Sequence, residues 1–220
     1  MLTKSRRPEG GLRPTDHINR RVTQSIFRGF DYATHSGMPL NLYVVINLRD
    51  ALAASAATVF ARVRHKYRDW LTHQRKKGLP VARPAYAFSF ENPRGMTHVN
   101  WVVHVPASLR PDFERKLRRW VTRAQGECGP HDICCKAVDP AYAKRLAKYI
   151  VKGTDPDYVG HFHLGQVHAP QGVVWGKRAG VSPAIGKTAR ALAGFRPRRR
   201  GFPNRAGIAP VASSGLALSR

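Results

Sequence analysis

The sequence predicts an α+β domain: a ferredoxin-like (RRM-like) antiparallel sheet with helices on one face and an open second face. Three observations lead to this fold class. Segments with apolar residues at every second position predict strands, and segments with apolar residues at helical spacing predict helices. The two kinds alternate in the order β, α, β, β, α, β, α, which suits a sheet whose helices all pack on the same side.

The first half of this order is a strand, a long helix and a hairpin. Residues 40–49 alternate and predict a half-buried strand, while residues 50–77 are rich in helix formers and end at a Gly-Leu-Pro stop. Residues 85–91 and 97–105 alternate again, around an Asn-Pro-Arg-Gly sequence that favours a type I turn. In this hairpin the aromatic residues are expected on one face and the polar residues on the other.

The second half adds a helix at about residues 111–123, a short strand near 133–138 and a helix at about 140–152. We expect the domain to span residues 21–194. A basic disordered arm over residues 1–20 and a basic flexible tail over residues 195–220 are expected to flank it, because both ends are polar and rich in arginine.

The charge of the chain predicts a polyanionic partner. Lys and Arg total 38 against 13 Asp and Glu, a formal net charge of +25, and nucleic acid is the commonest partner of so basic a chain. No long apolar run and no secretory signal are present, which predicts a cytoplasmic protein that does not bind membranes. The chain has three cysteines, and their spacing forms no CxxC motif. We therefore expect reduced thiols and no structural zinc site.

Polar residues of the hairpin predict a metal site. With a two-residue loop, Glu91 lies opposite Met96 and Ser89 lies opposite His98, so that Glu91 and His98 are diagonal neighbours on one face. Asn100 points the same way and adds an amide oxygen. A carboxylate, an imidazole and an amide suit Mg²⁺ or Mn²⁺ better than zinc.

Downstream, Tyr149 stands three residues before Lys152, on the same face of the predicted third helix. Such a pair can carry out phosphoryl transfer, with the phenol oxygen as the nucleophile and the ammonium offsetting the developing charge. Tyr142 shares nearly the same face. It is a second nucleophile or a core aromatic, and we favour the core.

The strand sequence HVNWVVHVP and the helix sequence YIVK together resemble the HUH endonuclease superfamily of rolling-circle replication initiators, relaxases and transposases, and especially initiators of bacterial plasmids and phages. Residues 170–190 are similar to the segment that follows the tyrosine helix in such initiators. The resemblance implies a site-specific nickase of single-stranded DNA at a replication origin. In this family a tyrosine forms a covalent link to the 5′ phosphate and leaves a free 3′ hydroxyl.

Carried onto this chain, the resemblance assigns the covalent link to Tyr149 and the metal to His98 and Asn100, with Glu91 as the acidic ligand. Position 100 departs from the family pattern, which usually has histidine there, so metal affinity should be lower. No helicase motif is present, so strand separation would come from supercoiling or a host helicase.

Four further residues are expected to contact nucleic acid: Tyr43, Arg49, Lys177 and Arg178. Two alternatives stay open. The first is a regulator that binds nucleic acid on the same fold without cutting it, and the second is a relaxase or transposase that uses the same chemistry.

Overall fold

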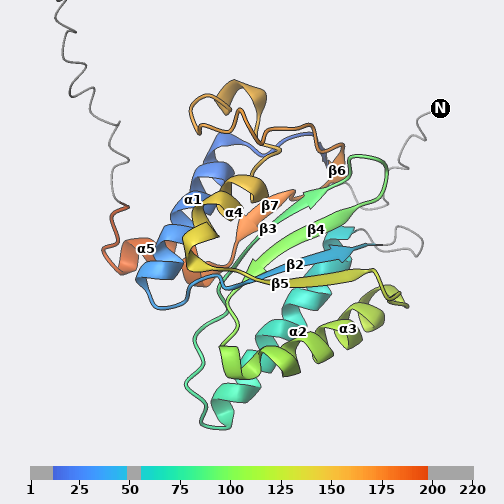
Figure 1. Ribbon diagram of the computed structural model, residues 1–220, viewed down its shortest axis with the longest axis vertical. Helices are drawn as coiled ribbons and strands as arrows, with labels where there is room; N and C mark the ends of the chain where they lie inside the picture. Colours follow the sequence, from blue (N-terminus) through green and yellow to red (C-terminus); the bar gives the residue numbers. More distant parts are fainter. Residues whose placement is uncertain (1–11, 49–55, 198–220) are drawn as a thin grey trace, which may run out of the picture.

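A computed structural model describes residues 12–48 and 56–197, and its centre is a five-stranded antiparallel sheet in an α+β fold (Figure 1). The strand order is β5-β2-β4-β3-β7. The strands are β2 (Leu42–Asn47), β3 (Tyr86–Glu91), β4 (His98–Val103), β5 (Ile133–Ala137) and β7 (Ala179–Val181). Two short strands, β1 (Pro14–Thr15) and β6 (Val174–Trp175), pair separately.

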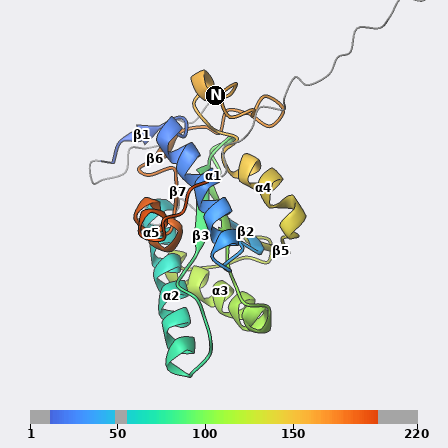
Figure 2. The same cartoon turned by 90° about the vertical axis from the view of Figure 1, so that its left-hand side faces the viewer.

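Helices lie on both faces of the sheet (Figures 1 and 2). They are α1 (Arg20–His35), α2 (Ala56–Lys76), α3 (Arg110–Gln125), α4 (Ala143–Ile150) and α5 (Lys187–Leu192). The strands β2, β3, β4 and β5 and the helices α2, α3 and α4 lie close to the ranges that the sequence predicts, whereas β1, β6, β7 and α5 were not predicted from the sequence. None of the helices among the described residues is long and apolar enough to cross a membrane.

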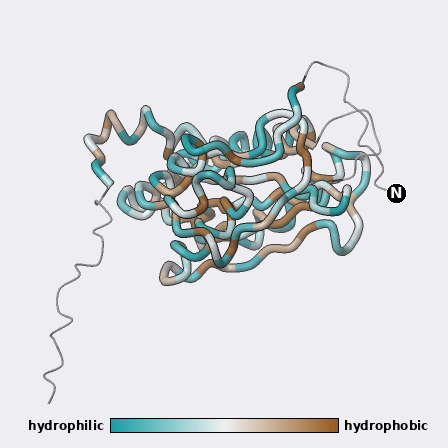
Figure 3. The backbone as a smooth tube through the Cα atoms, turned by 90° about the horizontal axis from the view of Figure 1, so that it is seen from above, coloured by the Kyte–Doolittle hydropathy of each residue, from teal (hydrophilic) through white to brown (hydrophobic). Residues whose placement is uncertain are grey.

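The face toward α2 and α3 holds an aromatic core. Trp101 from β4 is completely buried, and its ring lies 5.3 to 5.8 Å from those of Phe60, Tyr67 and Phe113. These side chains come from the apolar positions of the alternating strands and from the apolar faces of α2 and α3. In Figure 3, where the backbone is coloured by hydropathy, apolar and polar segments alternate along the chain.

The opposite face is covered by α1 and α4, which corrects the expectation of an open face. Small strand residues, among them Ala87 and Val102, pack there against Ile26 and Phe30 of α1 and Ile150 of α4. Helix α1 was missed because our predicted elements begin only at residue 40. The local signals for it are present: Asn19 caps the helix by accepting from Val22 N, and apolar residues recur at helical spacing.

The domain also begins earlier than residue 21. Ile18 is 3% exposed, and its backbone N–H donates to the Gly153 carbonyl at 2.8 Å. The hydroxyls of Thr23 and Thr154 meet at 2.9 Å in the same place. Residues just before α1 therefore belong to the packed domain rather than to a disordered arm.

The hairpin register differs from the predicted one by two residues. Glu91 lies directly opposite His98, and Ser89 lies opposite Asn100. The reason is that residues 92–97 form a longer connection than the expected two-residue loop. Because the shift is an even number of residues, every side chain keeps its predicted face of the sheet.

Candidate active site

The residues predicted for metal binding and for nucleophilic attack meet between the sheet and α4. Lys152, in the turn that follows α4, donates from Nζ to Glu91 Oε2 at 2.9 Å. The same Nζ lies 4.0 Å from the centroid of the Tyr149 ring. Strand β3 and helix α4 are far apart in the sequence, so only the fold brings the carboxylate, the ammonium and the phenol together.

Glu91 is the buried centre of this cluster. Its side chain is 3% exposed, and its Oε2 also accepts a hydrogen bond from His98 Nε2 at 3.0 Å. Burial alone would lower the pKa of Lys152, but hydrogen bonding with Tyr149 and Glu91 outweighs burial and raises that pKa above its usual value. Lys152 therefore stays positively charged at neutral pH and compensates the buried carboxylate.

Tyr43 on β2 connects the cluster to Asn100, a contact that the sequence did not predict. Its hydroxyl donates to Asn100 Oδ1 at 2.5 Å, and its ring meets that of Tyr149 edge-on at 6.2 Å. Burial raises the pKa of Tyr43 far above its usual value, and nearby Tyr149 and Glu91 add to this effect. Tyr43 is therefore a neutral hydrogen-bond donor that orients Asn100.

A pocket of about 640 Å³ opens beside the cluster. It is lined by three tyrosines, Tyr43, Tyr142 and Tyr149, together with Arg145 and Leu146 among others. Tyr149 is 39% exposed and Tyr142 is 53% exposed. Tyr149 is thus open to a ligand. The interpretation of Tyr142 as a core aromatic is wrong, because this residue lies in the short turn before α4 and is exposed along the pocket.

The side chains around Glu91 offer a hard divalent cation a small set of donors. Glu91 Oε1 and the amide nitrogen Asn100 Nδ2 are buried and have no hydrogen-bond partner among the described residues. An amide turned by half a rotation would present its oxygen instead of its nitrogen. His98 Nε2 faces Glu91 Oε2, so a cation shared by these two residues would bind this nitrogen in place of the hydrogen bond.

This set fits Mg²⁺ or Mn²⁺ by donor type, with one carboxylate, one imidazole and one amide. Glu91 would be the single charged ligand, and Lys152 already compensates its charge, so the set predicts weak binding. Within residues 12–48 and 56–197, no group of three or more His, Cys, Asp or Glu side chains is placed to hold a metal ion. A site here depends on the amide of Asn100.

The remaining predicted contacts to nucleic acid do not join this cluster. Lys177 is exposed and lies beside Gly180 and Phe88, on the sheet face opposite to Tyr149. Arg178 is 3% exposed, and its guanidinium donates to the carbonyls of Thr15, Phe90 and Gly172. Its expected role is corrected to a structural one, because a buried guanidinium that ties three segments together cannot reach a phosphate.

Arg49, the fourth predicted contact, lies outside the described residues. In comparisons with known proteins, no protein-family model matches the chain, and no curated protein matches it.

Proposed function

We propose that this protein is a metal-dependent endonuclease and strand transferase that nicks single-stranded DNA through Tyr149 and so initiates rolling-circle replication. The observation that carries the proposal is the position of Lys152, whose ammonium bonds Glu91 and lies against the Tyr149 ring. A phosphate at the exposed Tyr149 hydroxyl would lie beside a positive charge. The strand order β5-β2-β4-β3 agrees with the ferredoxin-like sheet of the HUH endonucleases that the sequence motifs resemble.

In the proposed reaction the Tyr149 hydroxyl attacks a backbone phosphorus. A bond forms between Tyr149 Oη and phosphorus while the bond from phosphorus to the 3′ oxygen breaks. The phenol gives up its proton, and the leaving 3′ oxygen takes one up. Lys152 offsets the negative charge that gathers on the phosphate, and Tyr43 restrains the Tyr149 ring from its edge.

Glu91, His98 and Asn100 are the residues that would hold a divalent cation, which when bound polarises a non-bridging phosphate oxygen. In the absence of a cation, these residues still have a structural role. Glu91 holds the Lys152 ammonium near the phenol, and His98 fixes the carboxylate from the other side.

The test is covalent trapping. The purified protein is incubated with Mn²⁺ and a pool of labelled single-stranded oligonucleotides of randomised sequence, and the mixture is resolved on a denaturing gel. We expect a labelled protein band that disappears with Tyr149→Phe. Tyr142→Phe is the matched control, since Tyr142 is an exposed tyrosine of the same pocket that does not contact Lys152, and it should leave the band in place. Loss of the band with Tyr142→Phe alone would contradict the assignment of the nucleophile.

A second candidate function has its own supporting observation. Glu91 and Asn100 are 3% and 1% exposed, and each already has a hydrogen-bond partner in Lys152 or Tyr43. Such a cluster can serve simply to hold α4 on the sheet, in a regulator that binds nucleic acid without cutting it. Salt-sensitive binding with no covalent band from the unaltered protein would favour this regulator. Relaxases and transposases would give the same band as an initiator, and replication of a plasmid that depends on this protein would separate them.

A further inference from the structure

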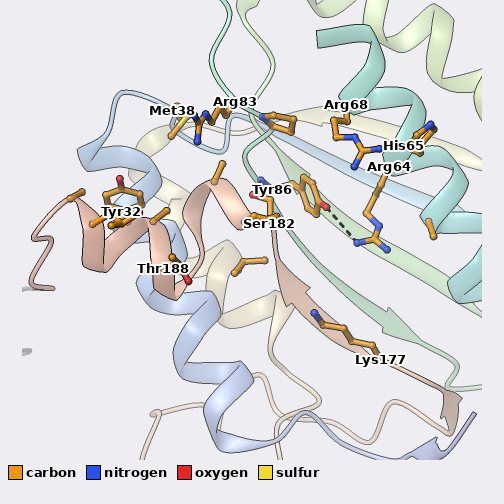
Figure 4. Close-up of a pocket in the computed structure, with 18 residues that line it drawn as sticks. Tyr32, Met38, Arg64, His65, Arg68, Arg83, Tyr86, Lys177, Ser182 and Thr188 are labelled. Atoms are coloured by element: carbon orange, nitrogen blue, oxygen red, sulfur yellow. Dashed lines mark hydrogen bonds between the residues drawn. The ribbon is translucent and has the colours of Figure 1, made fainter. Parts of the chain in front are cut away.

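A second and larger pocket lies at the other edge of the sheet, beside β7 (Figure 4). Its volume is about 1050 Å³, and its walls come from α1, α2, β7, the turn at Pro183–Ile185 and α5. None of its lining residues lines the pocket beside Tyr149. It is therefore a separate feature, which the proposed chemistry does not use.

The pocket is strongly basic. Four cationic side chains line it, Arg64, Arg68, Arg83 and Lys177, and none of the described residues that line it is Asp or Glu. No ion pair joins these four to a carboxylate within the described parts of the chain. The lining residue His65 has such a partner in Asp69, at 3.0 Å. Four cations around one cavity, with no carboxylate partner in the described ranges, indicate an anionic ligand.

Arg64 shows that one of these cations is held in place. Its guanidinium lies 5.0 Å from the ring centroids of both Phe60 and Phe88, and Nη1 donates to the Tyr86 hydroxyl at 3.4 Å. Its Nε is buried and has no hydrogen-bond partner among the described residues. Figure 4 shows Arg64 reaching from α2 toward Tyr86 along the pocket wall. The buried Nε cannot reach a ligand, but Arg64 as a whole is only half-buried, and a guanidinium fixed by packing is suited to a phosphate oxygen.

Part of the remaining wall is apolar. Val181, Ala184, Ala189 and Leu192 line it, and Leu192 is 86% exposed. A DNA duplex presents phosphates but keeps its bases stacked inside. Its bases therefore cannot contact such an apolar wall. A single strand presents phosphates to cations and unstacked bases to apolar and aromatic side chains.

We propose that this pocket binds a second segment of single-stranded nucleic acid, with Arg64, Arg68, Arg83 and Lys177 on its phosphates and the α5 side of the pocket against its bases. This inference rests on the proposed function, from which it takes single-stranded DNA as the ligand. It does not require that Tyr149 cleaves the strand. The pocket at the β7 edge would hold DNA that flanks the segment at Tyr149, near the β5 edge. A longer strand would therefore use both sites, and a short one only the first.

The experiment measures binding in the Tyr149→Phe background, where no covalent product can form. Fluorescence anisotropy of labelled oligo(dT) is recorded over a range of salt concentrations for the double variant Arg68→Gln/Lys177→Gln. The control is Arg119→Gln/Arg123→Gln, which removes the same charge from exposed positions on α3. Arg64 is left intact because it packs against the aromatic core.

We expect the pocket variant to bind long oligo(dT) on the order of tenfold more weakly than the control variant. Its salt slope should fall by about 1.4, because each lost phosphate contact on a single strand contributes about 0.7. Short oligo(dT) should bind both variants alike. Thermal unfolding of each variant checks that the fold is intact.

Equal loss of affinity in the pocket and control variants would overturn the proposal, because it would show only the effect of net charge. A larger loss with an oligo(dT)–oligo(dA) duplex than with the single strand would overturn the choice of ligand. Neither result depends on covalent trapping. Failure of the cleavage proposal, by contrast, would appear as a missing covalent band from the unaltered protein.

Discussion

The two faces of the sheet are built from the same strands but differ in composition and in task. Trp101 and Asn100 are neighbours on β4, and both are buried. Trp101 points into an aromatic cluster under α2 and α3, whereas Asn100 points into a polar cluster under α4. One face has close ring contacts throughout, while the other combines small apolar residues with buried polar groups.

This difference indicates that the two faces contribute unequally to the free energy of unfolding. The polar face leaves Ser89 Oγ, Glu91 Oε1 and Asn100 Nδ2 buried without a hydrogen-bond partner among the described residues, and the aromatic face leaves Trp101 Nε1 in the same state. Each such group costs free energy that packing elsewhere must offset. The aromatic face offsets it, so unsatisfied polar groups can persist at the candidate site. Four predictions test this division.

The largest effect is expected on the aromatic face. Trp101→Ala should lower the free energy of unfolding by about 4 kcal/mol, because it removes a completely buried ring and leaves a cavity. Asn100→Ala, one residue away on the other face, should cost about 1 kcal/mol or less, since it removes one hydrogen bond together with an unsatisfied amide nitrogen. Urea unfolding of both variants measures this, and equal losses would show that the two faces contribute alike.

Next in size is the buried ion pair. Lys152→Met leaves the Glu91 carboxylate buried without its cation, and we expect a loss of about 3 kcal/mol at neutral pH. Lys144→Met, at an exposed position on α4 itself, is the control and should change little. Adding Glu91→Gln to Lys152→Met should recover most of the loss. A double variant as unstable as the single one would mean that Lys152 acts through packing and not through charge.

A smaller effect is expected at alkaline pH, where both faces contribute. Burial is the main cause that raises the pKa values of Tyr67, on the aromatic face, and Tyr43, on the polar face, above their ordinary value of 10.0. A raised pKa in the folded state means that the stabilisation is complete below the unfolded-state pKa and is lost as the pH rises toward the folded-state pKa. Stability should therefore decline from about pH 10 upward.

Chemical denaturation across this range, with Tyr67→Phe and Tyr43→Phe, separates the two contributions. Each variant should lose less stability between pH 10 and more alkaline pH than the unaltered protein does. A slope unchanged in both variants would exclude these phenols as the source of the decline.

The smallest effect concerns two adjacent cysteines of β5 and changes no stability. Cys134 is exposed, opposite Val45, while Cys135 lies opposite Val44 and packs against the aromatic core. Burial, with help from Glu114 and Cys134, raises the pKa of Cys135 to about 12. We expect iodoacetamide at neutral pH to modify Cys134 well before Cys135, as mapped by peptide mass spectrometry. Faster labelling of Cys135 would place it on the outer side of the strand.

Much of the site was predictable because its signals are local. Alternation along each strand assigned Glu91, His98 and Asn100 to one face and Trp101 to the other, and helical spacing put Tyr149 beside Lys152. The register of the hairpin was not predictable in this way. A shift of two residues preserves every face, so alternation cannot distinguish the pairing of Glu91 with His98 from its pairing with Met96.

By itself, then, the sequence determined which side chains share a face, because that property repeats over two residues in a strand and over a turn in a helix. Tertiary structure alone decided that α1 and α4 cover the polar face, that Lys152 reaches Glu91 across the sheet, and that Tyr43 orients Asn100. These contacts join segments far apart in the chain. Their geometry depends on how whole elements pack, and no short stretch of sequence carries that information.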